Sequence, residues 1–150
     1  MGSKAQVTWV GPGLRLLGEA NGGPAIVLDG HGEQQTGPTP MELVLIGLAG
    51  CTAMDVVSIM AKKRQPLTSL QVQVEAERAP NHPKVYTAIH IKYIAYGDNI
   101  SPEALQRAIE LSEHTYCSAS AMLSKTATIT TSYEIISDRP APHVPADLVK

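Results

Sequence analysis

The segment from Thr39 to Pro66 constrains the fold more than any other part of the chain. It is the longest stretch with few polar residues, and it reads TPMELVLIGLAGCTAMDVVSIMAKKRQP. Thr39 followed by Pro40 and Glu42 is the pattern of a capping box, and basic residues from Lys62 onward suit the negative pole of a helix. The pattern predicts one helix of roughly 24 residues. Because apolar residues lie nearly all round it, this helix must be enclosed on all sides.

A membrane could also enclose such a helix. The uncharged part, however, runs only from Leu43 to Met54, 12 residues, before Asp55 interrupts it. A helix needs about 20 apolar residues to cross the hydrocarbon core of a bilayer. We therefore predict a central helix of a globular domain, with no membrane partner.

The remaining segments alternate between strand and helix patterns. Short apolar runs separated by Gly and Pro predict three strands, and a strictly alternating run followed by a turn predicts a long hairpin. Ser101 and Pro102 mark the start of an amphipathic helix. The expected elements are strands within 5–10, 13–19, 24–30, 70–78, 85–96 and 127–136, and helices within 101–114 and 117–125.

These elements predict an α+β fold, with mainly antiparallel sheets packed around the long central buried helix. We expect a single domain over residues 1–136 and a Pro-rich C-terminal tail over residues 137–150. One small sheet cannot cover a helix that is apolar all round. We therefore expect a homodimer in which two such helices pack together, with Gly47 and Gly50 allowing close approach.

Charge and targeting patterns narrow the class of protein. The net charge is −2, and the Lys and Arg residues are scattered, so nucleic acid is excluded as an expected partner. The N-terminus MGSKAQVTWV has no apolar core of a signal peptide, which predicts a cytoplasmic protein. In that reducing compartment, two cysteines 66 residues apart are either two buried small side chains or a redox pair. No C-x-x-C or H-x-x-x-H pattern occurs, so a zinc site is not expected.

The two cysteines differ in their expected surroundings. Cys51 lies inside the long helix, where a free cysteine usually only fills space. Asp55, one helical turn later, would disfavour a thiolate there, so a reactive Cys51 needs a cation from elsewhere in the fold. Cys117 lies where a loop meets a helix, and backbone N–H groups at such a place lower the pKa of a thiol. His114 nearby is either a polar surface residue or a base.

Two stretches resemble a known family. The first is GPTPMELVLIGLAGCTAMDVV, with P-x-E-L nine residues before a helical cysteine, and the second is YCSASAMLSKT before a final strand. Together they resemble the OsmC/Ohr family of osmotically inducible and organic hydroperoxide resistance proteins. The resemblance covers nearly the whole chain up to about residue 136 and is strongest to the less characterised OsmC-like branch.

The resemblance implies an antioxidant thiol peroxidase of the oxidative stress response. Its fold would be an intertwined homodimer with two sites at the subunit interface. Cys51 would match the peroxidatic cysteine, Cys117 the resolving cysteine and Glu42 the carboxylate of the site. An organic hydroperoxide would be the substrate, an external dithiol would be the reductant, and no cofactor would be needed. The contrasting hypothesis is a non-catalytic protein of the same fold that binds a small apolar ligand and has inert thiols.

Two further site residues raise geometric questions. Glu42 lies nine residues before Cys51, about 13 Å along an unbroken helix, so either the helix breaks near the two glycines or the partner chain supplies Glu42. Members of the family carry an arginine in a Gly-Arg-x-Gly turn that stabilises the thiolate. Here the stretch WVGPGLRLLGE places Arg15 in an expected strand, so Arg15 is either that cation or an outward-facing strand residue.

Overall fold

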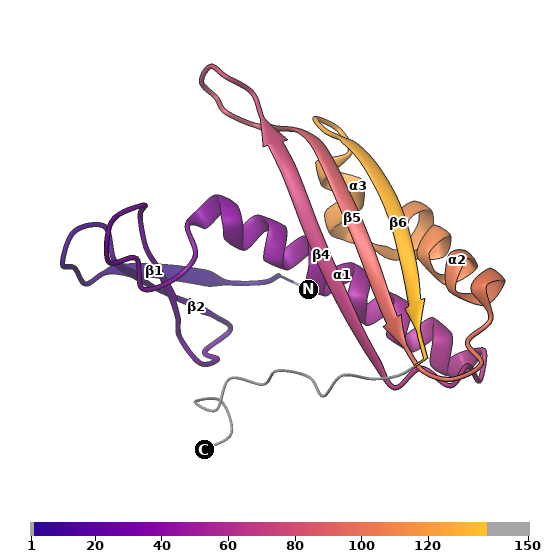
Figure 1. Cartoon of the computed structure of the whole chain (residues 1–150). Helices are drawn as coiled ribbons and strands as arrows, with labels where there is room; N and C mark the ends of the chain where they lie inside the picture. The colour runs from indigo at the N-terminus through magenta and orange to yellow at the C-terminus, as the bar shows by residue number, and fades with distance from the viewer. Residues whose placement is uncertain (1, 138–150) are drawn as a thin grey trace. The chain divides into compact units, whose positions relative to one another are not determined.

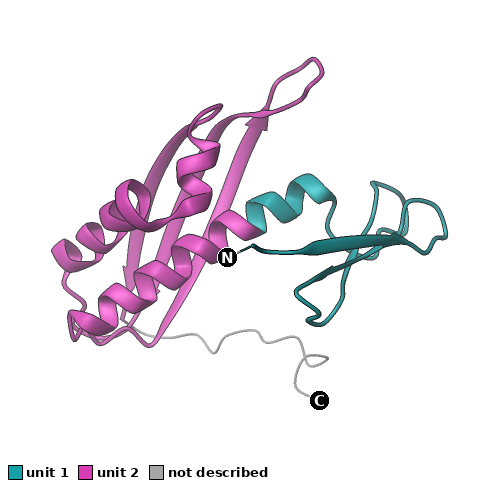
Figure 2. Ribbon diagram, turned by 180° about the vertical axis from the view of Figure 1, so that it is seen from behind, with its two compact units in different colours: residues 1–46 teal, residues 47–150 magenta. Residues whose placement is uncertain are grey.

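The computed structural model of the chain describes residues 2–137. Apart from Ser137, the predicted C-terminal tail therefore lies outside the described residues. The chain divides into two compact units, one ending at Ile46 and one beginning at Gly47, which Figure 2 distinguishes by colour. Each unit is described by itself below. The single domain expected over residues 1–136 stays a prediction.

The first unit contains a small antiparallel sheet. Its strands are β1 (Ala5–Trp9), β2 (Leu16–Ala20) and β3 (Ile26–Leu28), in the order β1-β2-β3. This confirms the three strands expected near the start of the chain. The turn between β1 and β2 carries two glycines with positive φ, Gly11 at 62° and Gly13 at 61°, a conformation that glycine adopts without steric cost.

The long helix α1 runs from Pro40 to Lys62 without interruption. Its first turn forms the predicted capping box: Glu42 N–H donates to Thr39 Oγ1 at 3.2 Å, and Thr39 N–H donates to Glu42 Oε2 at 2.7 Å. Pro40 occupies the first helical position, where its missing N–H costs nothing. Because α1 is continuous, a break near Gly47 and Gly50 is excluded as a way to bring Glu42 toward Cys51.

The second unit is a three-stranded sheet with helices on one face, as Figures 1 and 2 show from opposite sides. Strands β4 (Ser69–Arg78) and β5 (Tyr86–Tyr96) form the predicted antiparallel hairpin. Strand β6 (Thr128–Ile136) pairs with β5 in parallel, so the sheets are mainly but not wholly antiparallel. A parallel pair requires a long crossover. The crossover consists of α2 (Pro102–Leu111), the π-helical turn η1 (Ser112–Tyr116) and α3 (Ser118–Leu123).

Burial of α1 within the chain is confined to one face. Leu48, Thr52, Val56 and Met60, four residues apart, are fully buried, whereas Met54 is 77% exposed. The expected all-round cover is therefore not supplied by the described chain alone. Among the described helices, α1 is the one whose length and composition would allow it to cross a membrane, a criterion that core helices of globular proteins also meet.

Candidate functional site

The second unit brings the two cysteines together. Cys51 lies on α1, and Cys117 is the residue at which α3 begins. Their sulfur atoms and a carboxylate oxygen of Asp55 all lie within 4.8 Å of one another. The crossover from β5 to β6 brings Cys117 close to Cys51, although the two residues are 66 positions apart in the sequence. The sulfurs are thus close enough for a disulfide of about 2 Å to form after local side-chain and backbone adjustment.

The two thiols differ in access to solvent. Cys51 is partly exposed, whereas only 3% of Cys117 is exposed. The Cys117 sulfur accepts a hydrogen bond from Ser120 N–H at 3.4 Å, which favours the thiolate. Burial acts in the opposite direction and outweighs it, so the pKa of Cys117 is raised. The sequence-based expectation of a lowered pKa at this helix start was therefore wrong, because it did not account for desolvation.

The turn η1 positions Cys117. The sequence predicted a regular helix to residue 114, but the helix widens after Leu111, and Cys117 N–H donates to the Ser112 carbonyl at 2.8 Å, five residues back. Such π-helical turns are rare and often occur at functional sites. Here the turn buries Ser112 fully and leaves His114 exposed. Exposure favours the surface interpretation of His114.

Buried hydroxyl groups connect α1, β5 and η1. Thr52 Oγ1 lies 2.6 Å from the Tyr93 hydroxyl and 2.8 Å from Ser112 Oγ. Ser112 Oγ donates onward to Asp55 Oδ2 at 2.9 Å. Fully hydrogen-bonded networks of this kind fix the relative positions of the elements that carry them. The network therefore holds Asp55 beside the two sulfurs.

A second carboxylate lies at the other end of this network. Glu113 Oε1 accepts hydrogen bonds from the Tyr93 hydroxyl at 3.4 Å and from Ser120 Oγ at 3.1 Å. Burial raises the pKa of Glu113 despite these two hydrogen bonds. Glu113, Tyr93 and Thr52 were not predicted from the sequence. The available indication was a hydroxyl residue on the apolar stripe of α1, where a buried polar group needs a partner.

The stability of the Glu113→Gln variant relative to the wild type is expected to increase as the pH rises. The folded state raises the pKa of Glu113, so the wild type loses stability between the unfolded and folded pKa values and stays penalised above them. Gln keeps an Oε1 acceptor for both hydrogen bonds and carries no charge. The free energy of unfolding of both proteins should be measured in urea at pH about 4 and about 8. The value for the variant minus that for the wild type should be larger at the higher pH.

The control for this change is Glu75→Gln, at an exposed position on β4. It should leave the pH dependence of unfolding as it is in the wild type. A constant difference between Glu113→Gln and wild type at both pH values would contradict the assignment of burial as the dominant cause.

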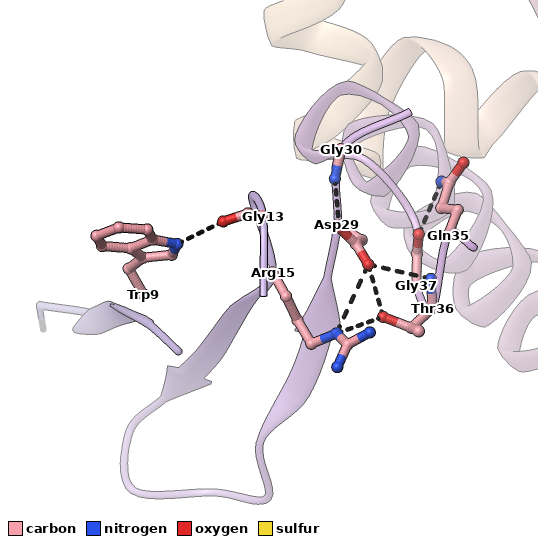
Figure 3. Close-up of polar contacts among 8 residues, drawn as sticks. All are labelled: Trp9, Gly13, Arg15, Asp29, Gly30, Gln35, Thr36 and Gly37. Carbon is pink, nitrogen blue, oxygen red and sulfur yellow. Dashed lines mark hydrogen bonds and ion pairs between the residues drawn. The ribbon is translucent and has the colours of Figure 1, made fainter. Parts of the chain in front are cut away.

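Arg15 makes its contacts within the first unit. It lies just before β2 and not inside the strand that the sequence predicted, because the β1–β2 turn extends to it. Its Nε donates to Thr36 Oγ1 at 2.9 Å and lies 3.7 Å from Asp29 Oδ2 (Figure 3). Thr36 also donates to Asp29 through its N–H and its hydroxyl. These hydrogen bonds, with a smaller contribution from Arg15, lower the pKa of Asp29.

Glu42 likewise has a local role. Its Oε2 accepts from Thr39 N–H at 2.7 Å and from Gln35 Nε2 at 3.4 Å. The hydrogen bonds with Thr39 are the main reason that the pKa of Glu42 is lowered. The capping interpretation is therefore confirmed. The catalytic roles of Glu42 and Arg15, both in the first unit, stay predictions.

Comparison with known proteins identifies the family. The sequence pattern of a family described as OsmC-like protein matches residues 30–132. The chain belongs to the OsmC-like family. The match includes Glu42 and both cysteines, and it ends inside β6.

Relatives of this OsmC-like chain match over most of their length. The protein YhfA of Escherichia coli strain K12 is 41% identical over 133 residues, which cover 89% of the chain and 98% of YhfA. A hypothetical protein of Aquifex aeolicus VF5 has a solved structure that is 29% identical, with a TM-score of 0.80, 93% of this chain covered and 99% of the other.

One further solved structure bears a functional name. It is an organic hydroperoxide resistance protein OsmC of Legionella pneumophila, described as a predicted redox protein. It is 13% identical to this chain, with a TM-score of 0.66, 89% of this chain covered and 97% of the other. At that identity the likeness concerns the fold alone. These structures confirm the OsmC-like α+β fold.

Proposed function

We propose that this chain is a thiol peroxidase that reduces organic hydroperoxides, with Cys51 as the nucleophile and Cys117 as the resolving cysteine. The observation that carries the proposal is the closeness of the two sulfurs, which lie within 4.8 Å of each other on separate elements. They belong to the only two cysteines in the sequence.

The reaction has three steps. The Cys51 thiolate attacks the terminal oxygen of ROOH, the O–O bond breaks, and the alkoxide takes a proton to leave as ROH while Cys51 becomes a sulfenic acid. The Cys117 thiol then attacks the Cys51 sulfur, which forms the disulfide and releases water. An external dithiol reduces the disulfide and is itself oxidised. A cytoplasmic location would supply that dithiol.

The surroundings of the two thiols support this order of attack. Partial exposure gives a hydroperoxide access to Cys51, whereas burial shields Cys117 from it. Burial also raises the pKa of Cys117, which favours its protonated form in the reduced chain. The name of the Legionella protein, organic hydroperoxide resistance protein, supports organic hydroperoxides as the substrate class.

The cation that stabilises the Cys51 thiolate is proposed to be Arg15. Both of its contacts in the described part of the chain use Nε, so the terminal amino groups of the guanidinium keep their donors. Asp29 and Thr36 would then act by orienting the guanidinium plane. Glu42 is proposed to contribute its carboxylate across a dimer, since the continuous helix separates it from Cys51 of its own chain by about 13 Å.

The functional form is proposed to be a homodimer. Ile46, Met54 and Val57 are 55%, 77% and 47% exposed and all lie on the outer surface of α1, and an exposed apolar surface on a helix supports a covering partner. A second copy of the chain would cover α1 without a membrane. Sedimentation velocity at micromolar concentration is expected to give twice the chain mass of 16.0 kDa. A species of single-chain mass over that range would contradict the dimer.

Intact mass measurement tests the peroxidase directly. Reduced protein treated with a slight excess of an alkyl hydroperoxide is expected to lose two hydrogen atoms per chain and both free thiols. Two free thiols after prolonged treatment would instead support the non-catalytic binding protein of the same fold.

A further inference from the structure

The cluster of Cys51, Asp55 and Cys117 also has the composition of a metal site. Two sulfur donors and one carboxylate oxygen lie within 4.8 Å of one another. In a tetrahedral zinc site with Zn–S bonds of about 2.3 Å, two sulfur donors are separated by about 3.8 Å. The two sulfurs therefore need to approach by no more than about 1 Å, and the carboxylate oxygen needs to approach each sulfur by no more than about 1.3 Å. Changes in side-chain torsion angles can supply movements of this size.

Hydrogen bonds around the cluster orient its carboxylate. Cys51 and Asp55 are four residues apart on α1, so they lie on one face of the helix. Ser112 Oγ donates to Asp55 Oδ2 at 2.9 Å, which orients the carboxylate and leaves it a second oxygen. Ser112 is in turn held by Thr52 Oγ1 at 2.8 Å. Hydrogen bonds of this kind to a ligating carboxylate are a regular feature of metal sites.

We propose that the reduced chain binds one Zn²⁺ ion through Cys51, Asp55 and Cys117. Two thiolates select a thiophilic cation over Mg²⁺ or Ca²⁺, which prefer oxygen ligands. Three protein ligands leave the fourth tetrahedral position to water or a small anion. The sequence pattern did not predict this site because its cysteines come from segments 66 residues apart and not from a C-x-x-C motif.

Zinc and the disulfide compete for the same sulfur atoms. A bound Zn²⁺ occupies both sulfurs and keeps the pair reduced, whereas a Cys51–Cys117 disulfide leaves neither sulfur as a thiolate ligand. Metal binding would therefore protect both thiols from alkylating reagents. This consequence does not depend on whether the chain reacts with hydroperoxides.

The test is a titration of the reduced full-length chain with Zn²⁺, followed by calorimetry, and with Co²⁺, followed by the absorption of cobalt–thiolate bonds. We expect one ion per chain. Asp55→Asn should weaken binding at least about 10-fold, because it removes an anionic ligand but keeps an acceptor for Ser112. Asp98→Asn, the same chemical change at an exposed position, should leave the affinity unchanged. Cys51→Ser and Cys117→Ser should each remove the cobalt–thiolate absorption expected of a two-sulfur site.

Several outcomes would overturn the proposal. The first is no binding at micromolar Zn²⁺. The second is equal binding by the disulfide form, which would indicate that surface histidines bind the ion. The third is an affinity that Asp55→Asn does not change. Zinc protection of both wild-type cysteines against iodoacetamide provides a measurement that needs no variant. Because no hydroperoxide is present in these experiments, zinc binding and peroxidase activity can fail independently.

Discussion

Cys51→Ser is expected to abolish the consumption of an alkyl hydroperoxide, with a loss of at least about 10³-fold in rate. A serine hydroxyl is far less ionised than a thiol at neutral pH and does not form a sulfenic acid. Cys117→Ser should behave differently. Its Cys51 can still react once, so one equivalent of hydroperoxide should disappear, and the mass should rise by one oxygen atom in place of the loss of two hydrogens.

Rapid mixing with an alkyl hydroperoxide, followed by intact mass and thiol quantification, separates these outcomes. Asp98→Asn, an exposed change in the turn after β5, is the control and should retain wild-type turnover. If Cys51→Ser still consumed hydroperoxide at the wild-type rate, the role of Cys51 as the nucleophile would be wrong. If Cys117→Ser formed a disulfide between two chains as fast as the wild type closes its own, the resolving role of Cys117 would be wrong.

The sequence predicted elements well where local chemistry determines them. The capping box at Thr39 and Glu42 and the N-cap at Ser101 lie where the pattern placed them. The alternation over 70–78 likewise predicted which residues of β4 lie on its exposed face and which lie on its half-buried face. Each of these features depends on residues within a few positions of one another, so that single-sequence periodicity and capping rules suffice.

The site was harder to predict because it depends on long-range packing. Pairing of Cys51 with Cys117 was expected only through resemblance to a family, since the crossover that joins them leaves no local pattern. The sign of the pKa shift at Cys117 was missed because desolvation depends on what covers the helix start. The widening at η1 was missed because a single π-helical turn of five residues is too short to leave a periodic pattern of its own.

Thr52→Val is expected to lower the free energy of unfolding by about 2 kcal/mol, or the melting temperature by roughly 5 °C. Thr52 is fully buried, and Val has nearly the same shape, so packing is preserved. The loss comes from the hydroxyl, which lies within hydrogen-bond distance of both Tyr93 and Ser112. Removing it leaves buried polar groups on β5 and η1 without that partner, and desolvated groups of this kind are costly.

The same change is expected to slow disulfide formation more than the first reaction with hydroperoxide. The Ser112 carbonyl accepts from Cys117 N–H, so a looser Ser112 loosens the backbone that carries the resolving sulfur. Cys51 keeps its own helix and its exposure. Single-turnover mixing should therefore show sulfenic acid formation at a near wild-type rate and disulfide closure about 10-fold slower.

Thr52→Ser is the matched control for this prediction. It keeps the hydroxyl and removes one methyl group, which should cost about 1 kcal/mol of stability without slowing disulfide closure. Equal closure rates in the Val and Ser variants would mean that the hydroxyl network contributes to stability alone. Slower disulfide closure in Thr52→Val but not in Thr52→Ser would support a role for the hydrogen bonds between α1, β5 and η1 in positioning the two sulfurs for reaction.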